Sequence, residues 1–197
     1  MLQARATERH DRLCDLAVLG SGPAGYVVAL KAALGLCDAP LHFRQEGDMP
    51  EYLETTVDKF IFKVATDRYY SDEGVWALAE GNRIRIGMTD FLQQRSGDIA
   101  FAEVKPAGTA LTVGDEVAVI ETIKVNVSLT SPVSGTVVEV NPAMELSPEV
   151  INQDPYGEGW LVVIEANDWP KDRDNLLDPQ AYFELMKGQA EEEAKKL

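Results

Sequence analysis

The sequence predicts a mainly β fold: a small sandwich of short strands with a short helix and a C-terminal helix, preceded by an N-terminal βα appendage. The first indication is the strict alternation of apolar and polar residues in short runs bounded by Gly, Pro and Asn. Residues 125–130 show this pattern, which is typical of half-buried strands. The second indication is a repeat, because a Gly-Thr pair opens a Val-rich strand at Gly108 and again at Gly135. A strand-turn-strand unit repeated around a central hairpin favours a quasi-symmetric sandwich.

Composition and charge limit the classes of partner. The chain has 197 residues and a formal net charge of -15, which argues against nucleic acid and anionic membranes because both bind basic patches. Cys14 and Cys37 form neither a zinc pattern nor a disulfide scaffold, so we expect a reducing, cytoplasmic location. No run has the apolar length of a membrane span, and residues 1–13 lack the apolar core of a secretory signal. We also expect a monomer.

A glycine-rich loop near the N-terminus is the second motif of interest. Asp15 to Leu19 predicts a buried strand, and Tyr26 to Leu36 predicts a helix. Between them lies a GxGxxG pattern formed by Gly20, Gly22 and Gly25, in which glycines let a pyrophosphate approach a helix N-terminus. This stretch resembles the opening FAD fingerprint of dihydrolipoamide dehydrogenase and related flavoproteins.

The surroundings of that loop do not complete a dinucleotide site. Such a site needs a whole βαβ unit that ends in an acidic residue for the ribose. The pattern of the candidate second strand, Leu41 to Gln45, is weak, and Glu46, the candidate acid for the ribose, comes later than in the flavoprotein pattern. No third strand of that fold follows Pro50. We therefore predict that residues 1–48 form a truncated Rossmann-like appendage and do not bind FAD, and Met49 offers an alternative start.

The middle of the chain reads as a series of strands. Alternation at Phe60, Phe62 and Val64 predicts a first strand, with residues 53–57 leading into it. Residues 74–78 and 83–86 then form a hairpin around a Gly-Asn turn.

A short helix follows this hairpin. Thr89 or Asp90 provides an N-cap for residues 91–95, and Gly97 ends the helix. Residues 98–104 form a further strand.

The C-terminal part predicts a closing strand and a long helix. Leu161 to Ala166 forms the strand. Asp178 is the N-cap and Pro179 the first residue of a helix that runs to about Lys196. We expect its core-facing stripe to consist of Ala181, Phe183, Leu185 and Met186.

Lys124 is the candidate functional residue. It lies between two apolar, β-branched runs, at the predicted tip of the central hairpin. If Val125 and Val127 point inward, then Lys124 points outward to solvent. The alternative is that Lys124 has no role beyond keeping the strand soluble, as is usual for an exposed lysine on a hairpin.

Several short motifs around Lys124 occur in the same order as in a known protein family. They are Ile86 to Phe91, Ser96 to Phe101, Glu121 to Lys124, Ser131 to Gly135, Glu139 to Asn141 and Asn152 to Trp160. On these motifs, residues from about Tyr69 to Leu197 resemble the H protein of the glycine cleavage system, a member of the lipoyl/biotinyl carrier family. The resemblance implies a lipoyl/biotinyl-type flattened barrel sandwich, or barrel-sandwich hybrid, over residues 52–197.

The resemblance also implies a site and a function. Lys124 would carry lipoate in amide linkage, with Glu121, Ile123 and Val125 supporting the attachment hairpin. The carrier would move an aminomethyl group from glycine decarboxylase to aminomethyltransferase. Dihydrolipoamide dehydrogenase would reoxidise the arm, and lipoate ligase would attach it. The chain would not itself be an enzyme, and its two histidines, His10 and His42, share no triad or metal-ligand spacing.

Three alternatives stay open at this point. Residues Tyr69 to Trp76 occupy the place of the family's His-Glu-Trp strand but lack its histidine, and Val125 stands where alanine is usual, so the chain could serve another lipoate-dependent pathway, such as sulfur oxidation through a heterodisulfide-reductase-like complex. Biotin is less favoured, because methionines usually flank a biotin lysine and here Ile123 and Val125 do. An FAD- or NAD-linked oxidoreductase fragment is the alternative from another class.

Overall fold

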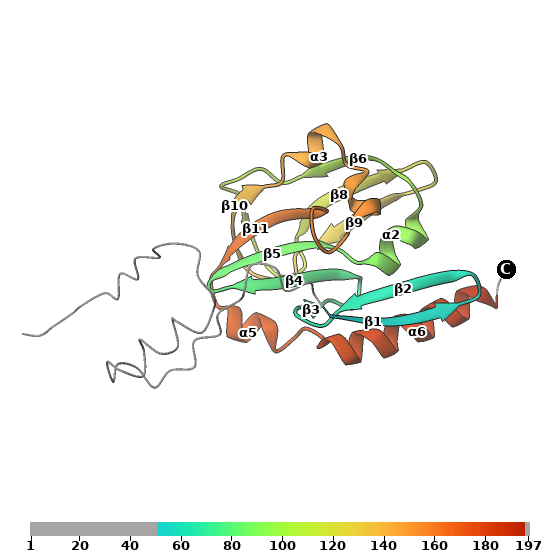
Figure 1. The fold of residues 1–197 in the computed structure, drawn as a ribbon. Helices are drawn as coiled ribbons and strands as arrows, with labels where there is room; N and C mark the ends of the chain where they lie inside the picture. The colour runs from blue at the N-terminus through green and yellow to red at the C-terminus, as the bar shows by residue number, and fades with distance from the viewer. Residues whose placement is uncertain (1–50, 196–197) are drawn as a thin grey trace, which may run out of the picture. The chain divides into compact units, whose positions relative to one another are not determined.

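The computed structural model describes residues 51–195 of the chain. The predicted βα appendage, with Gly20, Gly22 and Gly25, lies outside the described residues, as do both histidines and both cysteines. Figure 1 shows the described elements as two β layers above a long C-terminal helix. Within this part of the chain, no helix is long and apolar enough to cross a membrane.

The described chain is mainly β, as predicted. Its strands are β1 (Tyr52–Val57), β2 (Phe60–Ala65), β3 (Tyr69–Tyr70), β4 (Val75–Glu80), β5 (Arg83–Met88), β6 (Ile99–Val104), β7 (Ala110–Leu111), β8 (Glu116–Thr122), β9 (Asn126–Thr130), β10 (Gly135–Val140) and β11 (Trp160–Ala166). Its helices are α2 (Asp90–Ser96), α3 (Ala143–Leu146), α4 (Val150–Gln153), α5 (Trp169–Arg173) and α6 (Pro179–Ala194).

The strands form three sheets. The largest has the order β3-β4-β5-β11-β10-β7, the second has the order β6-β8-β9, and β1 pairs with β2 alone. All the pairings are antiparallel. The two larger sheets enclose one apolar core, to which Ile84 and Ile164 contribute from one sheet and Ile120 and Leu129 from the other. This arrangement confirms the predicted sandwich.

A second apolar layer covers the outer face of β4. Hairpin β1–β2, α2 and α6 lie on that face and bury Phe62, Phe91, Tyr182 and Met186 with Trp76. Figure 1 shows α6 running beneath the hairpin along much of its length. This layer attaches the hairpin and the C-terminal helix to the sandwich.

Trp76 and Arg68 join this second layer together. The Trp76 indole Nε1 donates hydrogen bonds to the carbonyls of Met88 and Pro155, both at 3.0 Å. A side chain at Gly87 would collide with the indole, because a Cβ there would lie 2.4 Å from Trp76 Cζ2. The buried Arg68 guanidinium lies 4.6 Å from the Trp76 ring and donates to the Tyr156 carbonyl at 2.9 Å. Residues far apart in the sequence are thus tied to one indole.

Local chemistry places several boundaries as predicted. Gly81, with φ 69°, makes the turn between β4 and β5. Thr89 caps α2 by accepting from the Leu92 amide, and Gly97 ends the helix with φ 89°. The Asp178 carboxylate caps α6 by accepting from the Ala181 amide at 2.8 Å, and Pro179 is the first residue of the helix. In each case a short polar side chain or a glycine meets a backbone need that its neighbours cannot meet.

Other expectations were incomplete or wrong. The lead-in and the first strand are two paired strands, because Asp58 takes a positive φ of 55° and turns the chain. The predicted closing strand does form, as β11, and it lies between β5 and β10. Short helices α3, α4 and α5 were not predicted.

The predicted stripe of α6 also needs correction. Ala181 is exposed, and Phe183 and Leu185 are only half-buried. Met186 is buried as predicted, Tyr182 and Ala190 are buried with it, and Phe183 and Leu185 pack against the same cluster. Residues four apart lie on one face of a helix, and this face meets the hairpin and β3.

The buried tyrosines of the second layer make the free energy of unfolding depend on pH in the alkaline range. Burial raises the pKa of Tyr182 to about 12. Unfolding returns it to about 10, so the stability tied to the neutral phenol is present below pH 10 and is lost as the pH rises towards 12. We expect the free energy of unfolding to fall between pH 9 and pH 11 by about 1 kcal/mol less in Tyr182→Phe than in the unchanged protein. Urea unfolding at both pH values measures this difference, and equal losses would contradict it.

Candidate functional site

Lys124 lies in the turn that joins β8 to β9. The strands pair up to Glu121 and Asn126, and the Thr122 amide donates to the Val125 carbonyl at 2.9 Å, closing the turn. The Thr122 hydroxyl accepts from the amides of Lys124 at 3.2 Å and Val125 at 3.0 Å. One threonine side chain therefore holds the backbone on both sides of the lysine. The sequence reasoning missed this role of Thr122, although a hydroxyl next to a strand end is a known turn signal.

The side chains at the tip point to solvent. Lys124 and Glu121 are exposed, and Ile123 is 79% and Val125 51% exposed. Val125 was expected to point inward, but it belongs to the turn, and inward alternation begins with Val127 and Leu129. Within residues 51–195, Lys124 makes no ion pair. Its amine is therefore open to an enzyme.

The tip is supported by the connection between α2 and β6. The Ile123 amide donates to the Asp98 carbonyl at 3.3 Å. The Lys124 stem lies over Gly97, where a Cβ would come within 3.6 Å of Cδ and 3.8 Å of Nζ. Gly97 has φ 89° and ψ -166°, a conformation that is essentially restricted to glycine. Gly97 therefore ends α2 in a glycine-only conformation, and the lysine stem lies against it at ordinary contact distance.

The base of the same hairpin is fixed by polar contacts. Glu116 accepts from the Ser128 hydroxyl at 2.7 Å and from Lys105 Nζ at 3.2 Å. These hydrogen bonds, Ser128 first, lower the pKa of Glu116. Asp115 accepts from the Thr112 amide and hydroxyl, which lowers its pKa as well. The hairpin that carries Lys124 is thus ordered at both ends.

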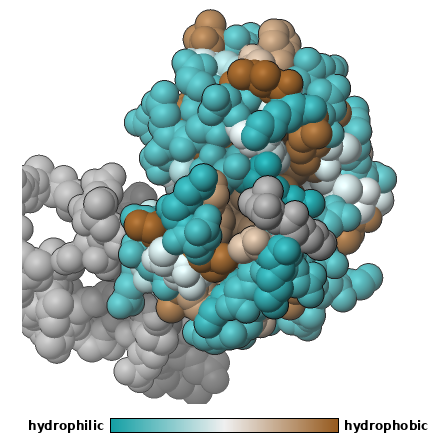
Figure 2. Space-filling model, turned by 90° about the vertical axis from the view of Figure 1, so that its right-hand side faces the viewer, coloured by the Kyte–Doolittle hydropathy of each residue, from teal (hydrophilic) through white to brown (hydrophobic). Residues whose placement is uncertain are grey.

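A groove of about 300 Å³ opens beside Lys124. Three segments far apart in the sequence form its walls: hairpin β1–β2, α2 and the end of α6. Figure 2 views the molecule from this end, with apolar surface set among hydrophilic residues. The lining residues are Val57, Asp58, Phe60, Phe62, Phe91, Gln94, Arg95, Lys124, Ala190, Glu193 and Ala194.

A second hollow of similar size lies on the other side of β2, near Asp90 and Tyr156. The Asp90 carboxylate accepts from the Lys63 amide and from the side chains of Gln93 and Gln94, each at 2.9 Å. The Tyr156 hydroxyl donates to the Lys63 carbonyl at 2.7 Å. The hydrogen bonds of these groups hold β2 on α2. Because the groups already have partners within the fold, the hollow offers little to a ligand.

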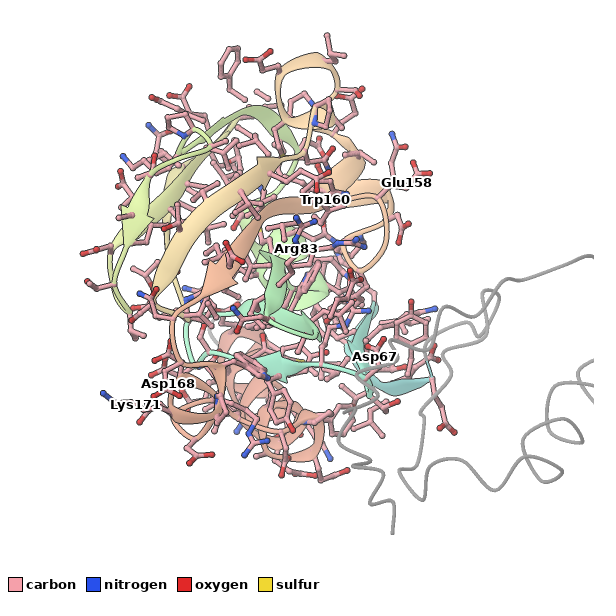
Figure 3. The ribbon with its side chains drawn as sticks, turned by 90° about the vertical axis from the view of Figure 1, so that its left-hand side faces the viewer. Asp67, Arg83, Glu158, Trp160, Asp168 and Lys171 are labelled. Atoms are coloured by element: carbon pink, nitrogen blue, oxygen red, sulfur yellow. The ribbon has the colours of Figure 1, made fainter. Side chains whose placement is uncertain are left out.

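The opposite end of the molecule has a different character. Figure 3 shows Arg83 of β5 and Trp160 of β11 on this face. Arg85 stacks 5.4 Å from the Trp160 ring and pairs with Glu80 at 3.4 Å. Near the bottom of this view, the Asp168 carboxylate caps α5 by accepting from the Lys171 amide at 3.4 Å. These contacts are structural.

Among residues 51–195, no group of three or more His, Cys, Asp or Glu side chains is placed to hold a metal ion. The arrangement that remains is an exposed amine on a rigid turn beside an apolar groove. Such an amine can be acylated, and an acyl chain on it could reach the groove.

Substituting Gly97 should destabilise the support of this turn. We expect Gly97→Ala to lower the free energy of unfolding by about 1–3 kcal/mol, because alanine must adopt a glycine-only conformation. Gly188→Ala is the control, since Gly188 lies within α6 with open space around it, and we expect a gain of about 0.5–1 kcal/mol. Chemical denaturation measures both. Equal effects of the two substitutions would show that Gly97 carries no backbone strain.

Comparison with known proteins agrees on one family. The glycine cleavage H-protein family matches residues 68–189. A glycine cleavage system H protein of Thermus thermophilus is 40% identical over 127 residues, which cover 64% of this chain and 98% of that protein. One of Symbiobacterium thermophilum is 45% identical over 119 residues, which cover 60% of this chain and 92% of that protein.

A solved structure is similar in the same part of the chain. The crystal structure of a glycine cleavage system H protein from Mycobacterium marinum aligns with a TM-score of 0.55 at 29% sequence identity. The alignment covers 60% of this chain and 95% of that one.

Proposed function

Because the chain belongs to the glycine cleavage H-protein family, we propose that it carries lipoate in amide linkage on Lys124. Proteins of this family are lipoyl carriers and not catalysts, and this chain is a lipoyl carrier of the glycine cleavage system. The observation that carries the assignment to Lys124 is its exposed amine on a turn that is hydrogen-bonded on both sides.

The residues around Lys124 fit this role. A ligase must bring an activated lipoyl carboxyl to the amine, which requires that no acidic partner occupies Nζ. Glu121, on β8 just before the turn, is exposed and can be read by the same enzyme. Lys124 would hold the lipoyl group, which would supply a disulfide: the aminomethyl carbon, carrying the electron pair released by decarboxylation at the partner, would bond to one sulfur, and the other sulfur would become a thiol after taking up a proton. The chain itself supplies the rigid attachment point and the long reach of the arm, which raises the local concentration of the group at each partner.

The acidic surface suits several partners. We propose that glycine decarboxylase, aminomethyltransferase, dihydrolipoamide dehydrogenase and lipoate ligase each meet this chain at the Lys124 end. A net charge of -15 steers it towards basic docking faces. We further propose that residues 52–197 form the carrier domain and residues 1–48 a separate appendage.

A second candidate function rests on departures near the site. Gly74 and Val75 stand before Trp76 where the family usually has His and Glu, and Val125 follows the lysine. Gly74 has φ 92°, and a Cβ added there would lie 3.1 Å from Leu92 Cδ2. A histidine at this position would therefore not fit without rearrangement. These differences motivate the second candidate, an H-like lipoate-binding protein that serves another lipoate-dependent pathway, such as sulfur oxidation through a heterodisulfide-reductase-like complex.

Lipoylation tests the assignment of Lys124. We expect the intact mass to rise by one lipoyl group after incubation with lipoate ligase, ATP and lipoate. Lys124→Arg should abolish the gain, because a guanidinium is not acylated and the turn keeps its charge. Lys105→Arg, which alters a half-buried lysine paired with Glu116 at the base of the same hairpin, should leave the gain unchanged. A mass gain in Lys124→Arg would place the lipoyl group elsewhere.

Bicarbonate exchange separates the two carrier functions. Lipoylated protein should support exchange of labelled bicarbonate into glycine by a glycine decarboxylase, as expected of a glycine cleavage carrier. A lipoylated H protein from the matched Thermus relative serves as the positive control. Exchange with the control but not with this protein would favour the specialised pathway.

A further inference from the structure

The turn that carries Lys124 is held at its side by residues 97–98, the α2–β6 connection. The Ile123 amide donates to the Asp98 carbonyl at 3.3 Å, and the lysine stem lies against Gly97. The place at which the turn presents its amine therefore depends on where the α2–β6 connection lies.

Pairing within the sheet does not fix the α2–β6 connection by itself. The register of β6 on β8 shifts between Ile99 and Phe101, so the ladder is irregular where β6 begins. A bulge of this kind leaves backbone groups that need partners outside the ladder, and bulges often lie next to functional sites, where they aim a nearby side chain. The backbone at this point needs a further contact.

Asn152, in the short helix α4, supplies that contact and binds the α2–β6 connection on both sides. Its Oδ1 accepts from the Ile99 amide at 3.0 Å, and its Nδ2 donates to the Gly97 carbonyl at 3.3 Å. These two backbone groups flank Asp98, whose carbonyl accepts from the Ile123 amide. One side-chain amide thus holds the segment that holds the turn.

Asn152 is itself fixed from two directions. Its Nδ2 also donates to Gln93 Oε1 at 2.7 Å, and Gln93 Nε2 donates to the Asp90 carboxylate at 2.9 Å. The neighbouring Ile151 is fully buried in the core between the two larger sheets. An inverted Asn152 amide would set its NH2 group against the Ile99 amide, so this network determines the orientation of the side chain.

We propose that Asn152 is a positioning residue for the acylation of Lys124, which acts through the α2–β6 connection and does not touch the reacting atoms. This inference rests on the proposed lipoylation of Lys124. In that reaction the deprotonated Nζ forms a bond to the acyl carbon of a lipoyl-adenylate made from lipoate and ATP. The bond from that carbon to the phosphate oxygen breaks, AMP leaves, and the proton of the amine passes to solvent. A displacement of the amine by about 1 Å can slow such an attack by up to about a hundredfold.

The kinetics of lipoylation test this role. The concentration of protein without lipoate is varied at saturating lipoate and ATP, and the gain in intact mass gives kcat and KM of the ligase. We expect Asn152→Ala to lower kcat about tenfold, because the amine lies less often at attack distance. KM should change by no more than about twofold, because Glu121 and the exposed faces of the hairpin are unchanged.

Asn152→Asp is the variant that preserves the shape of the side chain. It keeps the acceptor for the Ile99 amide, but it replaces the donor by an oxygen that faces the Gly97 carbonyl and Gln93 Oε1. We expect it to stay folded and to lower kcat in the same direction as Asn152→Ala. Circular dichroism checks the fold of each variant.

Asn141→Ala is the matched control. The Asn141 side chain is buried and makes three hydrogen bonds of the same kind, to the carbonyls of Glu158 and Trp160 and from the Ala143 amide. None of these bonds reaches residues 97–99. We expect this substitution to lower the free energy of unfolding but, in the folded protein, to leave kcat and KM unchanged.

Hydrogen exchange of the Ile123 amide, followed by NMR, tests the same contact without a ligase. We expect this amide to exchange about tenfold faster in Asn152→Ala than in the unchanged protein, because its acceptor at Asp98 is no longer held. Asn141→Ala should leave the exchange rate of this amide unchanged. An Ile123 amide that exchanges equally slowly in Asn152→Ala would overturn the role of Asn152.

The kinetic outcomes separate this inference from the proposed function. An unchanged protein that gains no lipoyl mass would overturn the assignment of Lys124, and the positioning role with it. A protein that is lipoylated as fast in both folded Asn152 variants as without substitution would overturn the positioning role alone. The same holds if Asn141→Ala lowers kcat as much as Asn152→Ala does.

Discussion

Burial of Ile120 and Leu129 between the two larger sheets is the interaction on which the exposed turn at Lys124 depends. These side chains lie opposite the core face of the large sheet and fix β8 and β9 as a pair. Because the strands are held from below, the three residues of the turn need no apolar contacts of their own. The tip can therefore be exposed and still ordered, which the proposed attachment of lipoate requires.

The second apolar layer gives the sandwich its sidedness. Trp76 lies on the outer face of β4 and is covered by elements from both ends of the described chain. Arg68 stacks on its ring and reaches the loop before β11, so a buried cation is satisfied by a carbonyl, a carboxylate and two aromatic faces. This layer brings hairpin β1–β2 and α6 to the end of the molecule where Lys124 lies. The groove beside Lys124 exists only because the hairpin, α2 and α6 meet there.

Sequence reasoning succeeded where one residue decides a local structure. The Gly-Asn turn, the Thr89 cap and the Asp178-Pro179 start each depend on chemistry within a few residues, and alternation on both sides predicted that Lys124 lies in a turn between two strands. It failed where distant segments decide. The turn at Asp58 has no glycine to mark it, the buried face of α6 is set by its partners, and Val125 is exposed because Thr122 closes the turn one residue later than alternation implied. The groove combines three segments that no local pattern connects.

The packing of hairpin β1–β2 on α6 has a consequence for the order in which the protein acquires its structure on the ribosome. The hairpin is the first described element to emerge, and α6, which covers its apolar side, is the last. Until α6 has been made, Phe62 has cover from Phe91 of α2 but not from the helix, so the nascent chain displays part of an aromatic surface that chaperones can recognise.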